Sequence, residues 1–219
     1  MNDNIITAGD GSVNKGRVAH SWCIARKSDF NIIVQGAGPT DGNPTTLTLV
    51  RPETIGCIAV SSLLHLICSA LLITTKIVPY YTDSEVLITN NANKHWHATK
   101  YVTCDDIDVI IENNRILRKI SINVIPTHVY GQQDRHTAYD DLDDIAKLNV
   151  YMDNLAGDFL DHTSPHLEPS EEPILFPSQQ IALKIRNKLV TSDVQTELVY
   201  SQQKQAIINH FEDRYTIPS

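Results

Sequence analysis

The feature that most limits the possible folds of this chain is an uncharged run of 19 residues, from Ile55 to Ile73. A run of this length must leave water, either in a protein core or in a lipid bilayer. Within it Ser61, His65 and Ser69 recur every four residues, the spacing of one face of a helix. A polar face gains nothing from contact with lipid. The run therefore predicts a largely buried, amphipathic core helix, with a membrane span as the minor alternative.

The segments around this run predict an α/β domain. Three strand-like segments precede it, at 4–9, 19–26 and 30–35, with a turn at 10–12 and a loop at 36–43. Pro52 is expected to open the helix, because proline is favoured in a first helical turn. The later elements are a strand at 76–82, a short helix, a helix at 105–118, a strand at 120–128 and a long helix at 138–160. This order predicts a five-stranded mixed sheet flanked by helices.

Composition divides the chain into a domain and an appendage. Residues 164–178 contain four prolines and three glutamates, which is typical of an extended linker. We expect one domain over residues 1–163 and a C-terminal extension, a β-hairpin followed by a helix, over residues 179–219.

Charge and cysteine content narrow the functional classes. With 18 Lys and Arg against 26 Asp and Glu, the net charge of −8 disfavours a general basic nucleic-acid-binding protein. It does not exclude an enzyme that uses clustered carboxylates. The four cysteines form no C-x-x-C pair and are expected to be free thiols in a reducing compartment: Cys23, Cys57, Cys68 and Cys104. With no signal peptide evident, we expect an intracellular location, either cytoplasmic or nuclear.

Four acidic residues stand at notable places in this outline. Asp10 is expected to end the first strand, Glu53 to lie in the first turn of the long helix, and Asp83 to end the fourth strand. Asp153 follows Met152 on the apolar stripe of the last core helix. Each acid alone has a simpler explanation, as a turn residue, a helix cap or a solvated position.

Five motifs containing these acids resemble, in order, those of ribonuclease H domains, especially the domains of retroelement polyproteins. The motifs are Asp10-Gly11-Ser12 followed by Trp22, Arg51-Pro52-Glu53, Thr82-Asp83-Ser84, the His128–Asp134 loop, and the Leu148–Ala156 helix with Asn149 and Asp153. The resemblance covers about residues 4–162. It implies a ribonuclease H-like fold, with the ends of the first and fourth strands side by side.

The same resemblance implies an activity and a set of site residues. Asp10, Glu53, Asp83 and Asp153 would bind two Mg²⁺ or Mn²⁺ ions and hydrolyse the RNA strand of an RNA–DNA hybrid. Residues expected to contact the substrate are Gly11, Ser12, Asn14 and Ser84. The implied partners are the hybrid and other domains of a polyprotein, and no membrane.

One position departs from the pattern. Gln132 stands where the family has a histidine that assists turnover, and an amide cannot exchange protons near neutral pH. We therefore expect slower catalysis, with His128 and His136 as possible substitutes. Two alternatives stay open: a weak or inactive ribonuclease H-like scaffold, and a related nuclease or transposase that cuts DNA.

Overall fold

The structure is a computed structural model that describes residues 4–14, 16–42, 48–74, 76–92 and 105–163, with short pieces between 184 and 206. The central strands are β1 (Ile5–Asn14), β2 (Arg17–Arg26), β3 (Ile32–Pro39), β4 (Ile77–Thr82) and β5 (Asn123–His128). The helices are α1 (Val50–Leu71), α2 (Glu85–Ala92), α4 (Ile107–Lys119) and α5 (Asp144–His162), with the 3₁₀ turns η1 (Gln133–Arg135) and η2 (Tyr139–Asp141). Two short strands, β6 (Lys184–Ile185) and β7 (Lys188–Leu189), pair with each other.

The predicted five-stranded mixed sheet is confirmed. Its strand order is β3-β2-β1-β4-β5, so the N-terminal strand lies in the middle. β1, β2 and β3 pair antiparallel as a meander, whereas β4 runs parallel to both β1 and β5. The parallel pairings require crossover connections, which α1 supplies before β4 and α4 before β5.

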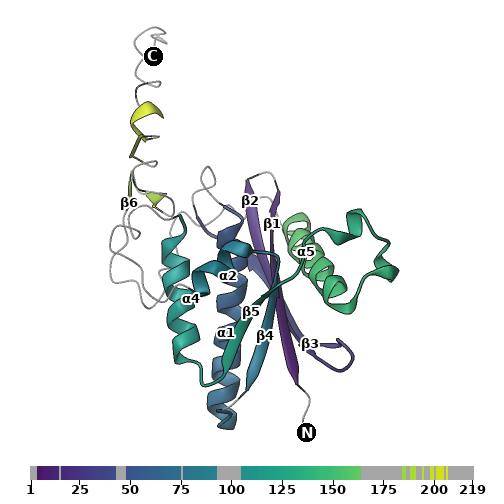
Figure 1. The fold of residues 1–219 in the computed structure, drawn as a ribbon. Helices are drawn as coiled ribbons and strands as arrows, with labels where there is room; N and C mark the ends of the chain where they lie inside the picture. The colour runs from purple at the N-terminus through teal and green to yellow at the C-terminus, as the bar shows by residue number, and fades with distance from the viewer. Residues whose placement is uncertain are drawn as a thin grey trace.

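Helices cover both faces of the sheet. α1, α2 and α4 lie on one face and α5 on the other (Figure 1). On the first face, Val60 and Leu64 of α1 pack with Val78 and Tyr80 of β4. On the second face, Met152 and Leu148 of α5 pack with a cluster of strand residues: Ile6, Ala8, Cys23 and Ala25. Ile6 and Ala8 lie two residues apart and so point to the same face of the sheet, because successive side chains of a strand point to opposite faces.

α1 is packed on the sheet over its first half, as expected for a core helix. Its length and composition alone would also permit a membrane crossing. The predicted polar face is only partly correct, because Ser61 is fully buried beside Cys57. The second half instead exposes apolar side chains, including Leu66 at 66% and Leu71 at 67%.

Two predicted boundaries are wrong because sheet pairing overrides local turn signals. Asp10-Gly11-Ser12 is not a turn, since β1 continues to Asn14 and pairs with β2 over its whole length. Likewise β3 runs through Gly36 and Gly38 into the predicted loop. Trp22 and His20 of β2 occupy the space that Cβ atoms would need at these two glycines.

The start of the last core helix also differs from the prediction. α5 begins at Asp144, not near 138, because Asp143 caps it by accepting a hydrogen bond from the Ala146 N–H at 2.7 Å. Asp140 and Asp141 belong to the preceding turn η2. The predicted linker at 164–178 lies outside the described residues, so the domain boundaries stay predictions; β6 and β7 fall within the predicted hairpin.

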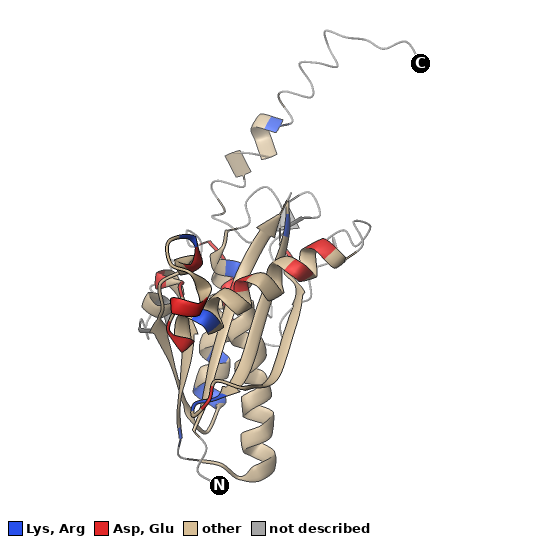
Figure 2. Ribbon diagram, turned by 90° about the vertical axis from the view of Figure 1, so that its right-hand side faces the viewer, with Lys and Arg blue, Asp and Glu red and all other residues tan. Residues whose placement is uncertain are grey.

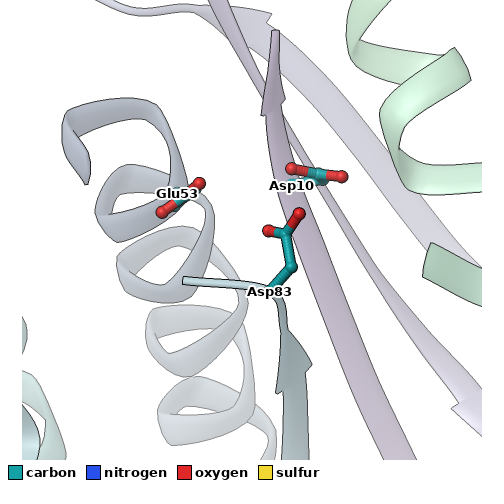
Figure 3. Close-up of side chains that lie close together, drawn as sticks. All are labelled: Asp10, Glu53 and Asp83. Atoms are coloured by element: carbon teal, nitrogen blue, oxygen red, sulfur yellow. The ribbon is translucent and has the colours of Figure 1, made fainter. Parts of the chain in front are cut away.

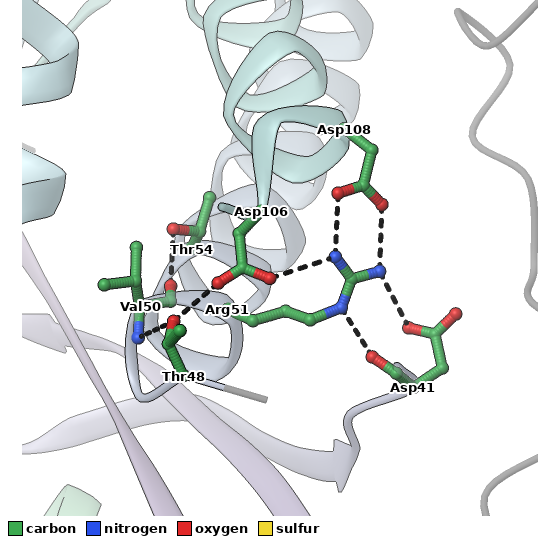
Figure 4. A network of polar contacts seen from close by, with 7 residues as sticks. All are labelled: Asp41, Thr48, Val50, Arg51, Thr54, Asp106 and Asp108. Atoms are coloured by element: carbon green, nitrogen blue, oxygen red, sulfur yellow. Dashed lines mark hydrogen bonds and ion pairs between the residues drawn. The ribbon is translucent and has the colours of Figure 1, made fainter. Parts of the chain in front are cut away.

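A buried ion-pair network joins α1 to two other segments (Figure 4). The guanidinium of Arg51, only 1% exposed, donates to both Asp108 oxygens at 2.8 and 2.9 Å. It also lies 3.5 Å from Asp106 and 3.6 Å from Asp41. Asp106 in turn accepts a hydrogen bond from Thr48 at 2.5 Å. The network fixes the first turn of α1 against the start of α4 and the segment after β3.

Replacing Arg51 should strongly destabilise the domain. In an Arg51→Met variant, three carboxylates would lose their shared cation, and leaving buried charges uncompensated costs about 3–5 kcal/mol. Urea unfolding measures this change. The matched control is Arg26→Met, which removes the exposed ion pair to Asp29 and should leave stability almost unchanged. Equal, small effects of both substitutions would contradict the role assigned to the network.

Candidate active site

The pairing of β1 with β4 brings two acidic residues together. Ala8 of β1 pairs with Tyr81 of β4, and Asp10 and Asp83 each follow two residues later. Because the strands are parallel, the two carboxylates emerge at the same edge of the sheet. Asp83 lies just past the end of β4, as predicted, whereas Asp10 lies inside β1.

Close packing of α1 on β1 adds a third acid. A Cβ at Gly11 would lie 2.6 Å from Cγ of Pro52, so only glycine allows the first turn of α1 to approach this closely. Glu53 follows Pro52 and points toward the two strand acids (Figure 3). Each of Asp10, Glu53 and Asp83 offers one oxygen, and these three oxygens lie within 4.8 Å of one another.

Burial and mutual repulsion make these acids hard to ionise. Burial is the larger cause and the neighbouring carboxylates add to it, which raises the pKa of Asp10 to about 9. Burial also raises the pKa of Glu53, to about 7, although a hydrogen bond from Ser84 partly offsets this. The pKa of Asp83 is raised by burial too, while the nearby His128 lowers it.

The donor set fits a hard divalent cation. Asp83 Oδ1 is buried without a hydrogen-bond partner, a costly arrangement unless another group binds it. Among the described residues, no Lys or Arg forms an ion pair with Asp10, Glu53 or Asp83. Three carboxylates with an unused oxygen are the kind of ligands that Mg²⁺ and Mn²⁺ prefer.

The fourth predicted acid lies near this group but outside it. Asp153 is exposed, and its oxygens are not among the three that converge. Its charge nevertheless raises the pKa of Asp10. Although the residue is exposed, partial desolvation of its carboxylate by the surrounding protein raises its own pKa, and Asp83 and Asp134 raise it further. α5 is fixed next to the site by the Ser21 hydroxyl, which donates to the Met152 carbonyl at 2.7 Å. The structure thus brings together three of the four acids and places the fourth at their edge.

The loop after β5 closes one side of the group. A Cβ at Gly131 would collide with the Asp83 carboxylate, so the loop backbone lies directly against this acid. Gln132 follows with a left-handed φ of 53°, and its side chain is exposed. His128 lies opposite Thr82, the residue before Asp83, in the β4–β5 pairing. The structure therefore places Gln132 and His128 near Asp83, and a catalytic role for Gln132 stays a prediction.

The predicted substrate contacts fall into two environments. Gly11, Ser12 and Asn14 are half-buried on the last part of β1, and Asn14 donates to Asp161 of α5 at 3.1 Å. Ser84 is buried, and its hydroxyl accepts a hydrogen bond from the Leu87 N–H of α2. Substrate binding by these four residues stays a prediction.

Sequence reasoning missed a tyrosine that supports the site. Tyr80 is fully buried in β4, fills the space above Gly9 and donates to the Glu53 carbonyl at 3.4 Å. Tyr80 lies in β4, three residues before Asp83, and its side chain points to the face of the sheet that α1 covers. The two-residue period of the strand was enough to predict this direction. Its partners could not be read from the sequence because they lie on two other elements.

Comparison with known proteins supports the same architecture. No protein-family profile matches the chain, and no curated protein matches its sequence. Among solved structures, LC11-RNase H1 from compost, in complex with RNA/DNA hybrid, superposes with a TM-score of 0.50. The match covers 72% of this chain and 97% of that one, at 14% identity. The chain has the ribonuclease H fold.

Other ribonuclease H structures are similar at lower scores. RNase H1 of Halobacterium salinarum is 15% identical, with a TM-score of 0.46 over 73% of this chain and 99% of its own. Prototype foamy virus protease-reverse transcriptase is 20% identical, with a TM-score of 0.47, and the match covers 72% of this chain and 21% of the viral one. At 14% identity, the likeness to LC11-RNase H1 establishes the fold alone.

The raised pKa values predict an unusual pH dependence without metal. The pKa of Asp10 is about 9 in the folded protein, against an ordinary value of 3.8, so the folded state favours the protonated form. The contribution of Asp10 to stability is therefore complete below about pH 4 and is lost as the pH rises toward 9. Glu53 acts in the same direction up to about pH 7. In EDTA, Asp10→Asn should therefore exceed wild type in stability at pH 8 by about 1–3 kcal/mol, and by much less at pH 4.5.

Urea unfolding at several pH values tests this expectation. Added Mg²⁺ or Mn²⁺ should stabilise the wild type more than Asp10→Asn, since the cation binds only the folded site. Asp158→Asn changes an exposed acid of α5 and serves as the control. Parallel pH curves for wild type and Asp10→Asn would contradict the electrostatic account.

Proposed function

We propose that this protein is a divalent-metal-dependent endonuclease that hydrolyses the RNA strand of RNA–DNA hybrids. The observation that carries the proposal is the convergence of Asp10, Glu53 and Asp83, within 4.8 Å, at one edge of a ribonuclease H sheet. The motif resemblance, which uses the sequence alone, leads to the same three acids. A fold alone does not define an activity, whereas a buried acidic group that forms no ion pair with any described Lys or Arg needs an explanation.

Four acids would hold the metal. Asp10, Glu53 and Asp83 form the inner group, and Asp153 would complete it from α5. When bound, two Mg²⁺ or Mn²⁺ ions would activate water for attack and stabilise the leaving oxygen of the phosphodiester. The chain's own contribution is to hold the carboxylates at fixed positions. Gly11 and Gly131 let α1 and the loop after β5 approach, and Ser84 hydrogen-bonds to Glu53.

The proposed substrate is a hybrid because its RNA strand carries a 2′-hydroxyl that can be read across the minor groove. Gly11, Ser12 and Asn14 are the candidates for this reading, since they continue β1 beyond Asp10. LC11-RNase H1, which shares the fold, was solved with an RNA/DNA hybrid. That complex supports the choice of substrate class.

Charge suggests that delivery of the substrate depends on other domains. Among the described residues, acidic residues gather toward the end of the sheet away from the N-terminus, while basic residues are scattered (Figure 2). A surface of this kind offers little electrostatic attraction to phosphates. We propose that the domain works within a retroelement-type polyprotein, inside the cell, where neighbouring domains supply affinity for nucleic acid.

Cleavage of a labelled hybrid tests the proposed activity. With Mg²⁺ or Mn²⁺ the wild type should shorten the RNA strand and leave 5′-phosphate ends, and EDTA should stop the reaction. Asp10→Asn and Asp83→Asn should lower the rate at least about a hundredfold, because each removes a charged metal ligand. Asp158→Asn, which changes an exposed acid of α5 outside the convergent group, should cut at the wild-type rate.

Two outcomes would favour the alternatives. Cleavage of duplex DNA without cleavage of the hybrid would indicate a related DNA nuclease. Absence of any cleavage, together with no Mn²⁺ binding by calorimetry, would indicate a ribonuclease H-like scaffold.

Restoring the histidine should speed turnover. Gln132→His would add a group that exchanges protons near neutral pH, for which we expect a rise in kcat of about tenfold. The backbone can accept the change, because His and Asn both tolerate the left-handed φ of 53° at this position. Gln132→Asn keeps an amide and is the control. If both variants cut at the wild-type rate across pH 6–9, Gln132 does not face the reaction.

A further inference from the structure

An exposed aromatic ring lies at the edge of the carboxylate group. Tyr130 is 74% exposed, the highest value among the tyrosines that the structure describes. A singly exposed aromatic side chain is common on protein surfaces and is not informative by itself. Tyr130 differs in its position, because the next residue, Gly131, lies directly against the Asp83 carboxylate.

The backbone beneath this ring is held in place on both sides. The buried Val129 precedes Tyr130, and its N–H donates to the Thr82 carbonyl at 3.0 Å. On the other side, the Gln133 side chain donates to the Tyr130 carbonyl at 2.8 Å. The first bond connects the loop to the end of β4, next to Asp83, and the second braces the loop internally. The ring is therefore carried by an anchored backbone at a fixed place beside the acids.

A second ring orients the first. His128 contacts Tyr130 edge to face, with ring centroids 5.2 Å apart and planes at 86°. This arrangement is favourable for aromatic pairs and limits the rotation of the tyrosine. Tyrosine also has only two side-chain torsions, so fixing its side chain against a ligand costs little conformational entropy.

We propose that Tyr130 is a nucleic-acid contact whose ring packs on a sugar of the bound hybrid, beside the phosphodiester held at the acids. The inference rests on the proposed function and adds a specific residue to it. In a duplex the bases stack on one another, so a protein ring beside the backbone meets sugar faces at the minor groove. A neutral ring also suits this surface, because it binds without relying on the phosphate charge that the surrounding acids repel.

Equilibrium binding to a fluorescent hybrid measures the strength of the contact. Ca²⁺ replaces Mg²⁺ in this assay, because its larger and looser coordination shell is suited to binding without turnover. Tyr130→Leu should bind about fivefold more weakly than wild type, at the low end of the effect of removing a stacking aromatic. Tyr130→Phe keeps the ring and should bind within about twofold of wild type. In Mg²⁺, Tyr130→Leu should raise KM and leave kcat nearly unchanged.

Hydroxyl-radical footprinting separates a direct contact from a structural role, because the radicals report the exposure of individual sugars. Wild type should protect one or two sugars next to the cleaved phosphodiester, and Tyr130→Leu should lose this protection while the rest of the footprint persists. Tyr139→Leu alters another exposed tyrosine, 48% exposed in η2, and should retain the full footprint. Thermal unfolding of each variant confirms that the fold is intact.

The outcomes distinguish this inference from the proposed function. If wild type binds and cuts the hybrid, and Tyr130→Leu matches it in affinity and footprint, the contact is wrong and the proposed function stands. Equal losses of hybrid affinity and sugar protection in Tyr130→Leu and Tyr139→Leu would also overturn the proposed contact, since a general surface effect would then explain both. If wild type neither binds nor cuts the hybrid, the proposed function fails and the contact fails with it.

Discussion

The close approach of three largely buried carboxylates where β1, β4 and α1 meet is the constraint on which the rest of this structure depends. Burial raises the pKa values of all three acids, and the charges of neighbouring acids raise those of Asp10 and Glu53 further. The fold nevertheless holds them together, through the parallel pairing of β1 with β4 and the close approach of α1 at Gly11. Such an arrangement costs stability in the isolated chain. Bound cations would offset the cost, because they favour the ionised carboxylates.

Two residues in the first turn of α1, Arg51 and Glu53, each lie in a cluster of acids, and the negative charge of the two clusters is balanced in different ways. Arg51 brings its own positive charge to Asp41, Asp106 and Asp108, and all four side chains are satisfied within the protein. Two residues later, Glu53 enters a group in which no described Lys or Arg forms an ion pair. The contrast argues that the second grouping is built to receive charge from outside the chain. The Arg51 network supports this site by fixing the helix turn from which Glu53 projects.

The sequence, together with the motif resemblance, was sufficient for the mixed sheet, for the neighbouring first and fourth strands and for three of the four acids predicted to converge, because the motifs lie on elements that its pattern indicates. It was insufficient wherever distant pairing overrides a local signal. Asp10-Gly11-Ser12 has the composition of a turn, yet ten ladder pairs with β2 keep it extended. The partners of Arg51 lie 10, 55 and 57 residues away, a spacing that no local pattern indicates. Asp153 seemed to face inward beside Met152, but helix α5 turns it to the exposed edge of the site.

The positions of the acidic residues in the fold explain part of the surplus of acids over bases. Part of the charge of −8 lies in the convergent group, where a divalent cation would reverse the local field. Another part surrounds the start of α5, where Asp143 caps the helix and its neighbours remain exposed. Neither part attracts phosphate in the absence of metal. Under the proposed function, affinity for a hybrid would then come from bound cations, from uncharged contacts such as an anchored aromatic ring, and from any neighbouring domains.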